Sequence, residues 1–236
     1  RYIDSKDRDL ISVSAFVKKF EPKKDWNKIT AAYAKKNGMT VKEVKDLWEM
    51  KRDKGSQAGT IFHEIREKQL LSDEFIYDNQ TLAKKTCDFI DGCKYSIPIS
   101  EIQNGYVYPE LMIYNEDYMI CGQSDKVIVQ DNHIHIWDYK TDKSIDFKAF
   151  SSEWVKPEKL QKPLSHLDNC NGNLYSLKMS LYMYMLWKAN KGRFKPGKII
   201  LEWCPLERDE QGIPILYDGV PCETKREIIE LPYRKK

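Results

Sequence analysis

A pair of alternating apolar segments joined by two polar residues constrains the fold most. Residues 118–130 and 133–141 flank the loop 131–132, and their alternating hydrophobicity is typical of half-buried strands. A two-residue loop closes an antiparallel hairpin and allows only one pairing register between its two strands. In that register the residue before the loop is opposite the residue after it, and the pairing continues outward until Asp125 is opposite Asp138.

The two aspartates would end an apolar stripe on one face of this hairpin. Strand alternation places four branched apolar residues on the same face: Val127, Val129, Ile134 and Ile136. Opposed carboxylates on such a face repel each other, and the loss of water increases the cost. A divalent cation such as Mg2+ or Mn2+ between Asp125 and Asp138 would relieve the repulsion, because hard cations prefer oxygen ligands.

Lys140 is the third member of the predicted centre. It follows Asp138 by two residues, so it lies on the same face, about 6.6 Å further along the strand. Its ammonium group can reach a phosphate or a metal-bound water, and the backbone carbonyl of Tyr139 can supply one more oxygen. An ordinary buried ion pair between Asp138 and Lys140 is the alternative, but it leaves the opposed Asp125 unexplained.

The preceding alternating segment, residues 106–114, contributes another acid. The turn that follows it lies near residues 115–117. An even number of loop residues puts Glu110 on the face of Asp125, whereas an odd number puts it on the reverse face. We expect the even loop, and with it a third carboxylate at the centre.

Helical patterns surround the strands on both sides. We expect a mixed α/β fold, in which a central mixed sheet with an antiparallel meander is flanked by helices, and we divide the chain into a helical N-terminal region (1–58) and a core (59–236). The expected elements are a helix from Ser12 or Ser14 through Phe20, helices over 29–36 and 41–50, a loop over 54–59, a helix from Thr60, a helix over 173–189, and strands over 198–206 and 226–233.

Basic residues are concentrated in the N-terminal region, although the net charge of the chain is only +3. Between Lys18 and Lys54 there are twelve Lys or Arg against six Asp or Glu, which leaves the rest of the chain acidic. This asymmetry is expected if the N-terminal region contacts nucleic-acid phosphates while the core gathers carboxylates. A pair of solvated, lysine-rich helices is the simpler alternative.

Cysteine spacing and hydropathy exclude several classes of protein. The six cysteines form no CxxC pair, so neither a zinc knuckle nor a disulfide framework is indicated. No run approaches the roughly 18 apolar residues of a membrane span, and the first ten residues contain no apolar signal segment. We expect a cytoplasmic protein without a membrane partner.

Five short motifs, in this order, resemble the RecB-like branch of the PD-(D/E)XK nucleases. They are GTIFHEIRE (59–67), PE (109–110), GQSD (122–125), DYK (138–140) and the tyrosine-bearing helix KMSLY (178–182). Within that branch the chain looks most like phage-type exonucleases and the mitochondrial genome maintenance exonuclease group. The resemblance spans roughly residues 55–190 of the chain.

The resemblance implies a restriction-endonuclease-like core and a metal-dependent deoxyribonuclease. It implies an exonuclease that hydrolyses phosphodiester bonds with Mg2+ or Mn2+ during DNA processing, recombination or repair in a bacterial or phage-infected cell. The implied site residues are His63, Asp125, Asp138 and the Tyr139 carbonyl as metal ligands, Lys140 as the catalytic lysine, and Glu110 as a ligand or water anchor.

One departure from the family concerns the last motif. The family often has QxxxY on this helix, and here Lys178 replaces the glutamine while Tyr182 is retained. Residues at i and i+4 share a helical face, so both are expected to contact the nucleic acid or its phosphates. The alternative is that this helix simply buries its tyrosines and methionines in the core. No iron–sulfur cluster is expected, because no four-cysteine group follows the helix.

Single-stranded DNA or duplex ends are the expected substrate, with a helicase or recombinase as a candidate partner. Two other functions remain open. The same metal site serves a structure-selective or restriction-like endonuclease, and the departure at Lys178 keeps open a non-cleaving DNA-binding protein that assists recombination.

Overall fold

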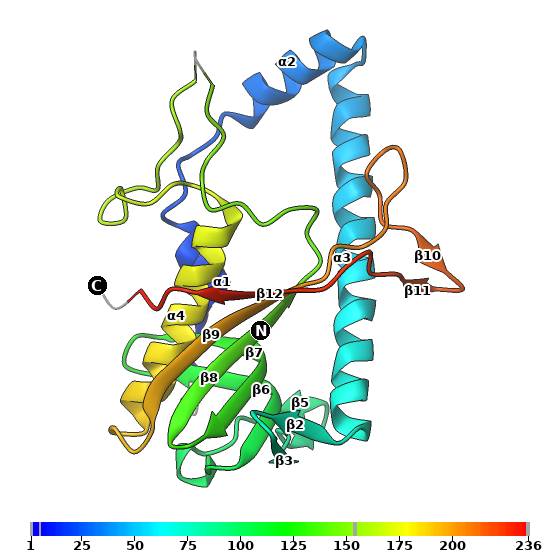
Figure 1. The fold of residues 1–236 in the computed structure, drawn as a ribbon. Helices are drawn as coiled ribbons and strands as arrows, with labels where there is room; N and C mark the ends of the chain where they lie inside the picture. The colour runs from blue at the N-terminus through cyan, green and yellow to red at the C-terminus, as the bar shows by residue number, and fades with distance from the viewer. Residues whose placement is uncertain (1, 5, 153–154, 235–236) are drawn as a thin grey trace.

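The computed structural model describes residues 2–4, 6–152 and 155–234. In these residues a mixed sheet follows the order β12-β9-β8-β7-β6-β3-β2, with β1 beside β7, and four α-helices surround it (Figure 1). The elements are β1 (Ile11–Ser12), α1 (Val13–Lys18), α2 (Trp26–Asn37), α3 (Val41–Ser72), β2 (Phe75–Tyr77), β3 (Gln80–Lys84), β4 (Phe89–Ile90), β5 (Cys93–Lys94), a 3-10 turn (Ile99–Glu101), β6 (Tyr106–Asn115), β7 (Ile120–Gln130), β8 (His133–Lys140), α4 (Asn171–Ala189), β9 (Lys195–Trp203), β10 (Leu216–Tyr217), β11 (Val220–Pro221) and β12 (Glu227–Leu231). The expected mixed α/β fold with a mixed sheet and helices is confirmed.

Within its paired residues the meander β6-β7-β8 has the predicted register, but the predicted pair of Asp125 with Asp138 is not formed, because the pairing of β7 with β8 ends before it. Its second hairpin pairs Gln130 with His133 and continues to Lys126 with Trp137. In its first hairpin Asn115 pairs with Ile120, so the connecting loop has an even number of residues, as expected. The turn of the second hairpin is set by local chemistry, because Asp131 and Asn132 adopt the left-handed φ values of 49° and 60° that a two-residue hairpin loop requires.

The hairpin changes at the acidic residues. Beyond Lys126 the backbone N–H of Tyr139 donates to the Asp125 carboxylate at 2.6 Å, in the place of a backbone partner. On β6, Glu110 has a φ of 47°, which breaks the pleat. Tyr108 and Leu111 consequently belong to the same apolar core, although strict alternation would put them on opposite faces. The sheet therefore opens where its carboxylates lie.

Helix α4 covers one face of the sheet and carries the chain from β8 to the parallel strand β9 (Figure 1). Its residues Met179 and Met183 are fully buried against Val127 and Ile136. Helix α1, capped by the Ser12 side chain, packs against α4. None of the helices in the described part of the chain has the length and apolar content that a bilayer span requires.

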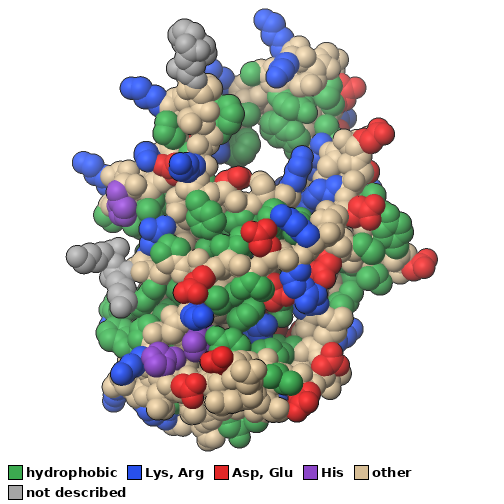
Figure 2. All heavy atoms as spheres, viewed as in Figure 1, with side chains coloured by type: hydrophobic (Ala, Val, Ile, Leu, Met, Phe, Trp, Pro, Cys, Tyr) green, Lys and Arg blue, Asp and Glu red, His purple; other side chains and the backbone are tan. Residues whose placement is uncertain are grey.

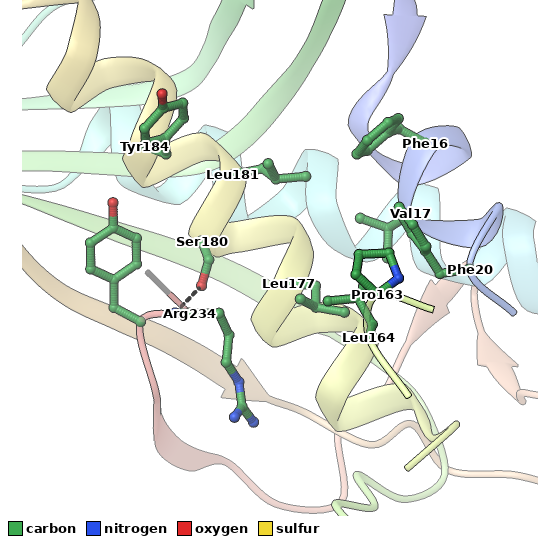
Figure 3. A pocket seen from close by; sticks show the side chains of 11 residues that line it. Phe16, Val17, Phe20, Pro163, Leu164, Leu177, Ser180, Leu181, Tyr184 and Arg234 are labelled. Carbon is green, nitrogen blue, oxygen red and sulfur yellow. Dashed lines mark hydrogen bonds between the residues drawn. The ribbon is translucent and has the colours of Figure 1, made fainter. Parts of the chain in front are cut away.

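An apolar cavity of about 270 Å3 remains between α1 and α4. Figure 3 shows three of the side chains that line it: Phe16 on α1, Phe20 in the turn after α1, and Leu181 on α4. The backbone N–H of Arg234 donates to the Ser180 hydroxyl at 2.9 Å and closes one side of it. Among the residues that the structure describes, no acidic or histidine side chain lines this cavity, so it is separate from the carboxylates of the hairpin.

The predicted loop at residues 54–59 and the helix start near Thr60 are wrong. Helix α3 runs without interruption from Val41 to Ser72, and a capping box between Thr40 and Glu43 begins it. Each glycine in the helix costs about 1 kcal/mol relative to alanine. Burial of Ala58 and Phe62 against Tyr139 offsets this cost, since long-range packing decides most helical stability.

A single helix therefore crosses the predicted boundary between residues 58 and 59. Its second half packs on the sheet, whereas its first half and α2 extend past the sheet (Figure 1). The segment between β8 and α4 extends in the same direction on the other side of the molecule.

Candidate metal centre

Three side chains from three different elements converge where the sheet opens. They are His63 on α3, Glu110 on β6 and Asp125 on β7, and each offers a ligand atom within 4.8 Å of the others. His63 Nδ1 is 3.4 Å from Asp125 Oδ1. One imidazole and two carboxylates are donors that divalent cations accept. The donor set of this cluster therefore fits a metal ion, which it would hold through one nitrogen and at least two oxygens.

Each member of the cluster is positioned by its own element. Phe62 is buried against Tyr139, with ring centroids 6.4 Å apart, and this contact turns the next residue of α3, His63, toward the hairpin. The irregular φ of Glu110 directs its side chain toward Asp125, where the Gln123 side-chain amide donates to its carboxylate. The three ligands thus depend on packing between α3 and two strands.

Burial and charge shift the pKa values of two of these groups. Burial, together with the negative charge of Asp125, raises the pKa of Glu110 to about 7. Burial alone would lower the pKa of His63, but the hydrogen bond and the charge of Asp125 outweigh it and raise that pKa. Like charges held this close favour protons or a cation, so the cluster has the electrostatics of a cation site.

Asp138 is fully buried, with 1% of its side chain exposed, and both of its oxygens contact lysines. Lys140 Nζ bonds to Oδ2, and Lys178 Nζ is 3.0 Å from Oδ1. Burial would raise the pKa of Asp138, but the charges of Lys140 and Lys178 outweigh it and hold the pKa far below its usual value. The positive charge next to Asp138 is thus supplied by ammonium groups, the ion-pair alternative that the sequence had left open.

The backbone around Asp138 links the two parts of the centre. The Tyr139 carbonyl, expected as a metal ligand, accepts a hydrogen bond from Lys140 Nζ at 2.8 Å, while the N–H of the same residue donates to Asp125. The structure therefore brings all the predicted residues together but divides them. His63, Glu110 and Asp125 form one cluster, and Asp138 with its lysines forms the other.

Lys178 and Tyr182 both face this centre from α4, one helical turn apart. The Tyr182 side chain is 2% exposed and belongs to the core, and its ring lies where a Cβ on Gly122 would be. The burial that the sequence offered as an alternative thus applies to Tyr182. The Lys178 ammonium group instead donates to Asp138, and its Nζ lies 5.5 Å from the Tyr182 ring centroid.

Tyr175 is a neighbour of the centre that sequence reasoning missed. Its ring lies 5.0 Å from Lys140 Nζ, and its hydroxyl donates to Asp142 Oδ2 at 2.6 Å. The signal was available, because Tyr175 precedes Lys178 by three residues and so shares its face of α4. Strand period puts Gln123 on the same face as Asp125, but its contact with Glu110 is visible only in the structure.

Comparison with known proteins adds no relative to this geometry. No protein-family model matches the chain, and neither the curated proteins nor the solved structures contain a match.

Glu110→Gln is expected to stabilise the metal-free protein at high pH. The folded-state pKa of Glu110, about 7, exceeds its ordinary value of 4.5, so the wild type loses stability as the pH rises from 4.5 to 7. The neutral variant should avoid this loss, which is on the order of 1–3 kcal/mol at about pH 8. Denaturant unfolding in the presence of a chelator, at about pH 5 and about pH 8, measures the difference.

Glu64→Gln on the exposed face of α3 is the matched control, and it should keep the pH dependence of the wild type. At high pH, added Mn2+ should increase the stability of the wild type more than that of Glu110→Gln. Equal pH profiles for the wild type and Glu110→Gln would contradict the assignment of Glu110 to a repulsive acidic cluster.

Proposed function

We propose that the protein is a metal-dependent deoxyribonuclease, most simply an exonuclease, with a restriction-endonuclease-like core of the RecB-like PD-(D/E)XK type. One observation carries the proposal. A cluster of His63, Glu110 and Asp125 that offers three ligands for a cation lies beside the Asp138–Lys140 pair, at the point where β7 and β8 separate. This combination supports phosphodiester hydrolysis, because a metal ion can activate the attacking water and a fixed positive charge can stabilise the negative charge that develops on the phosphoryl oxygens.

His63, Glu110 and Asp125 would hold Mg2+ or Mn2+, which when bound lowers the pKa of a water and polarises a phosphoryl oxygen. Asp138 holds the Lys140 ammonium group in place through its carboxylate, and the Tyr139 carbonyl fixes a second of its hydrogens. The third hydrogen is left to orient the attacking water or to neutralise charge on the phosphoryl oxygens. Lys140 is therefore the proposed catalytic lysine.

Surface charge supports DNA as the substrate. Figure 2 shows basic side chains around the two projections, formed by α2 with the first half of α3 and by the segment between β8 and α4. Each projection also carries a highly exposed aromatic side chain, Trp26 at 60% and Phe150 at 78%. Lysines neutralise phosphates and exposed rings stack on bases, so these projections suit a nucleic-acid strand.

Cleavage of end-labelled DNA tests the function. Linear and circular DNA, each single- and double-stranded, are incubated with Mg2+ or Mn2+ and with a chelator control. We expect metal-dependent loss of the linear substrates from their ends. Cleavage of circular DNA would favour an endonuclease, and DNA binding without cleavage would favour an accessory protein for recombination. A protein that neither binds nor cleaves any of these DNA substrates would overturn the proposal.

A further inference from the structure

Lys178 stands where the resembled family often has glutamine, and it brings an additional positive charge into the centre. Its Nζ is 3.0 Å from Asp138 Oδ1, while Lys140 occupies Oδ2 of the same carboxylate. Asp138 is thus bonded by a lysine on each oxygen, and its side chain is only 1% exposed. A carboxylate bridged in this way has little capacity left to serve as a shared ligand between two metal ions.

The position of Lys178 is determined by the packing of α4. One residue further along, Met179 is fully buried, and one turn further along the Tyr182 ring lies against the backbone of Gly122. The Lys178 side chain itself is 18% exposed. The Lys178 ammonium group could reach solvent only if α4 rotated, and rotation would disrupt these contacts. The ammonium group therefore stays at the centre.

Charge balance favours this arrangement. Glu110, Asp125 and Asp138 bring three negative charges when ionised, and Lys140 and Lys178 bring two positive charges. One divalent ion then leaves an excess of one positive charge, which a single phosphodiester neutralises. A second divalent ion would leave a large uncompensated charge in a buried site, which is costly.

We propose that Lys178 takes the place of a second divalent ion at Asp138, so that the protein binds a single ion, at His63, Glu110 and Asp125. This inference rests on the proposed nuclease function. It makes Lys178 a positioning residue that acts through Asp138, and it predicts a metal stoichiometry that the cleavage assay alone does not determine.

Calorimetric titration with Mn2+, together with counting of bound Mn2+ by electron paramagnetic resonance, tests the stoichiometry. The wild type should bind one ion per chain, and Lys178→Gln should bind two, because Asp138 Oδ1 becomes free to act as a ligand. The dependence of cleavage rate on Mn2+ concentration should change in step, from first order to second order at low concentration.

Two control variants keep the test decisive. Lys178→Arg retains the charge and should bind one ion, and it replaces Lys178→Gln as the informative variant if the latter does not fold. Lys188→Gln removes the same charge from an exposed position of α4 and should also bind one ion. Circular dichroism verifies the fold of each variant.

Two bound ions in the wild type or in Lys178→Arg would overturn the inference, and so would a single ion with unchanged affinity in Lys178→Gln. In each of these cases a wild type that cleaves DNA leaves the proposed function standing. Absence of both metal binding and cleavage would overturn the inference and the proposed function together.

Discussion

Lys140→Ala is expected to lower the rate of DNA cleavage by about a thousandfold, the loss typical of removing one fixed group that stabilises transition-state charge. The reason is geometric: Lys140 Nζ is held by the Asp138 carboxylate and by the Tyr139 carbonyl, at 2.8 Å from the latter. Lys178 does not occupy the place of that ammonium group, because it is bonded to the other oxygen of Asp138. Single-turnover cleavage of linear DNA measures the loss.

Lys140→Ala should affect the stability of the fold much less than the rate of cleavage. After removal of Lys140, Asp138 keeps Lys178 as its charged partner, so the buried carboxylate is not left alone. Thermal unfolding should therefore show a cooperative transition, and metal binding at His63, Glu110 and Asp125 should persist. Lys143→Ala, in an exposed position just after β8, is the matched control and should cleave normally. Full activity in Lys140→Ala would rule out its catalytic role.

Gly122→Ala is expected to destabilise the protein strongly. A Cβ at residue 122 would lie 2.5 Å from Cε1 and from the hydroxyl oxygen of Tyr182, which is closer than real Cβ contacts. The Tyr182 ring is fixed in the core and cannot move without displacing α4, so overpacking should cost about 1–3 kcal/mol of unfolding free energy. Denaturant unfolding measures this loss, and metal titration should show weaker binding, because Asp125 lies three residues away on β7.

Gly59→Ala provides the control for this substitution. A Cβ at residue 59 would find only the Thr141 hydroxyl, at an ordinary contact distance of 3.6 Å. Since residue 59 lies inside α3, alanine should leave stability unchanged or raise it by up to about 1 kcal/mol.

Tyr182→Leu tests the mechanism of the Gly122 effect. If the clash with the ring is the cause, the double variant should lose less stability than the two single variants added together. A Gly122→Ala protein as stable as the wild type would show that α4 does not press on β7 at this point.

The hairpin at the centre was predictable because its information is local. A two-residue loop and strict alternation set the pairing from Gln130 with His133 to Lys126 with Trp137, without reference to the rest of the chain. The same reasoning failed for α3, where Gly55 and Gly59 suggested a loop. Their cost is local, but the contacts that offset it come from Tyr139 and Cys204, far along the chain.

The sequence by itself determined which residues gather: Asp125, Asp138 and Lys140 share one hairpin, and strand period alone puts them at one end of it. Only the tertiary structure decided how they are divided. The packing of α3 brings His63 to Asp125, and the packing of α4 brings Lys178 to Asp138. The physical reason is that periodicity specifies the face on which a side chain lies, whereas the partner it meets depends on which elements pack together.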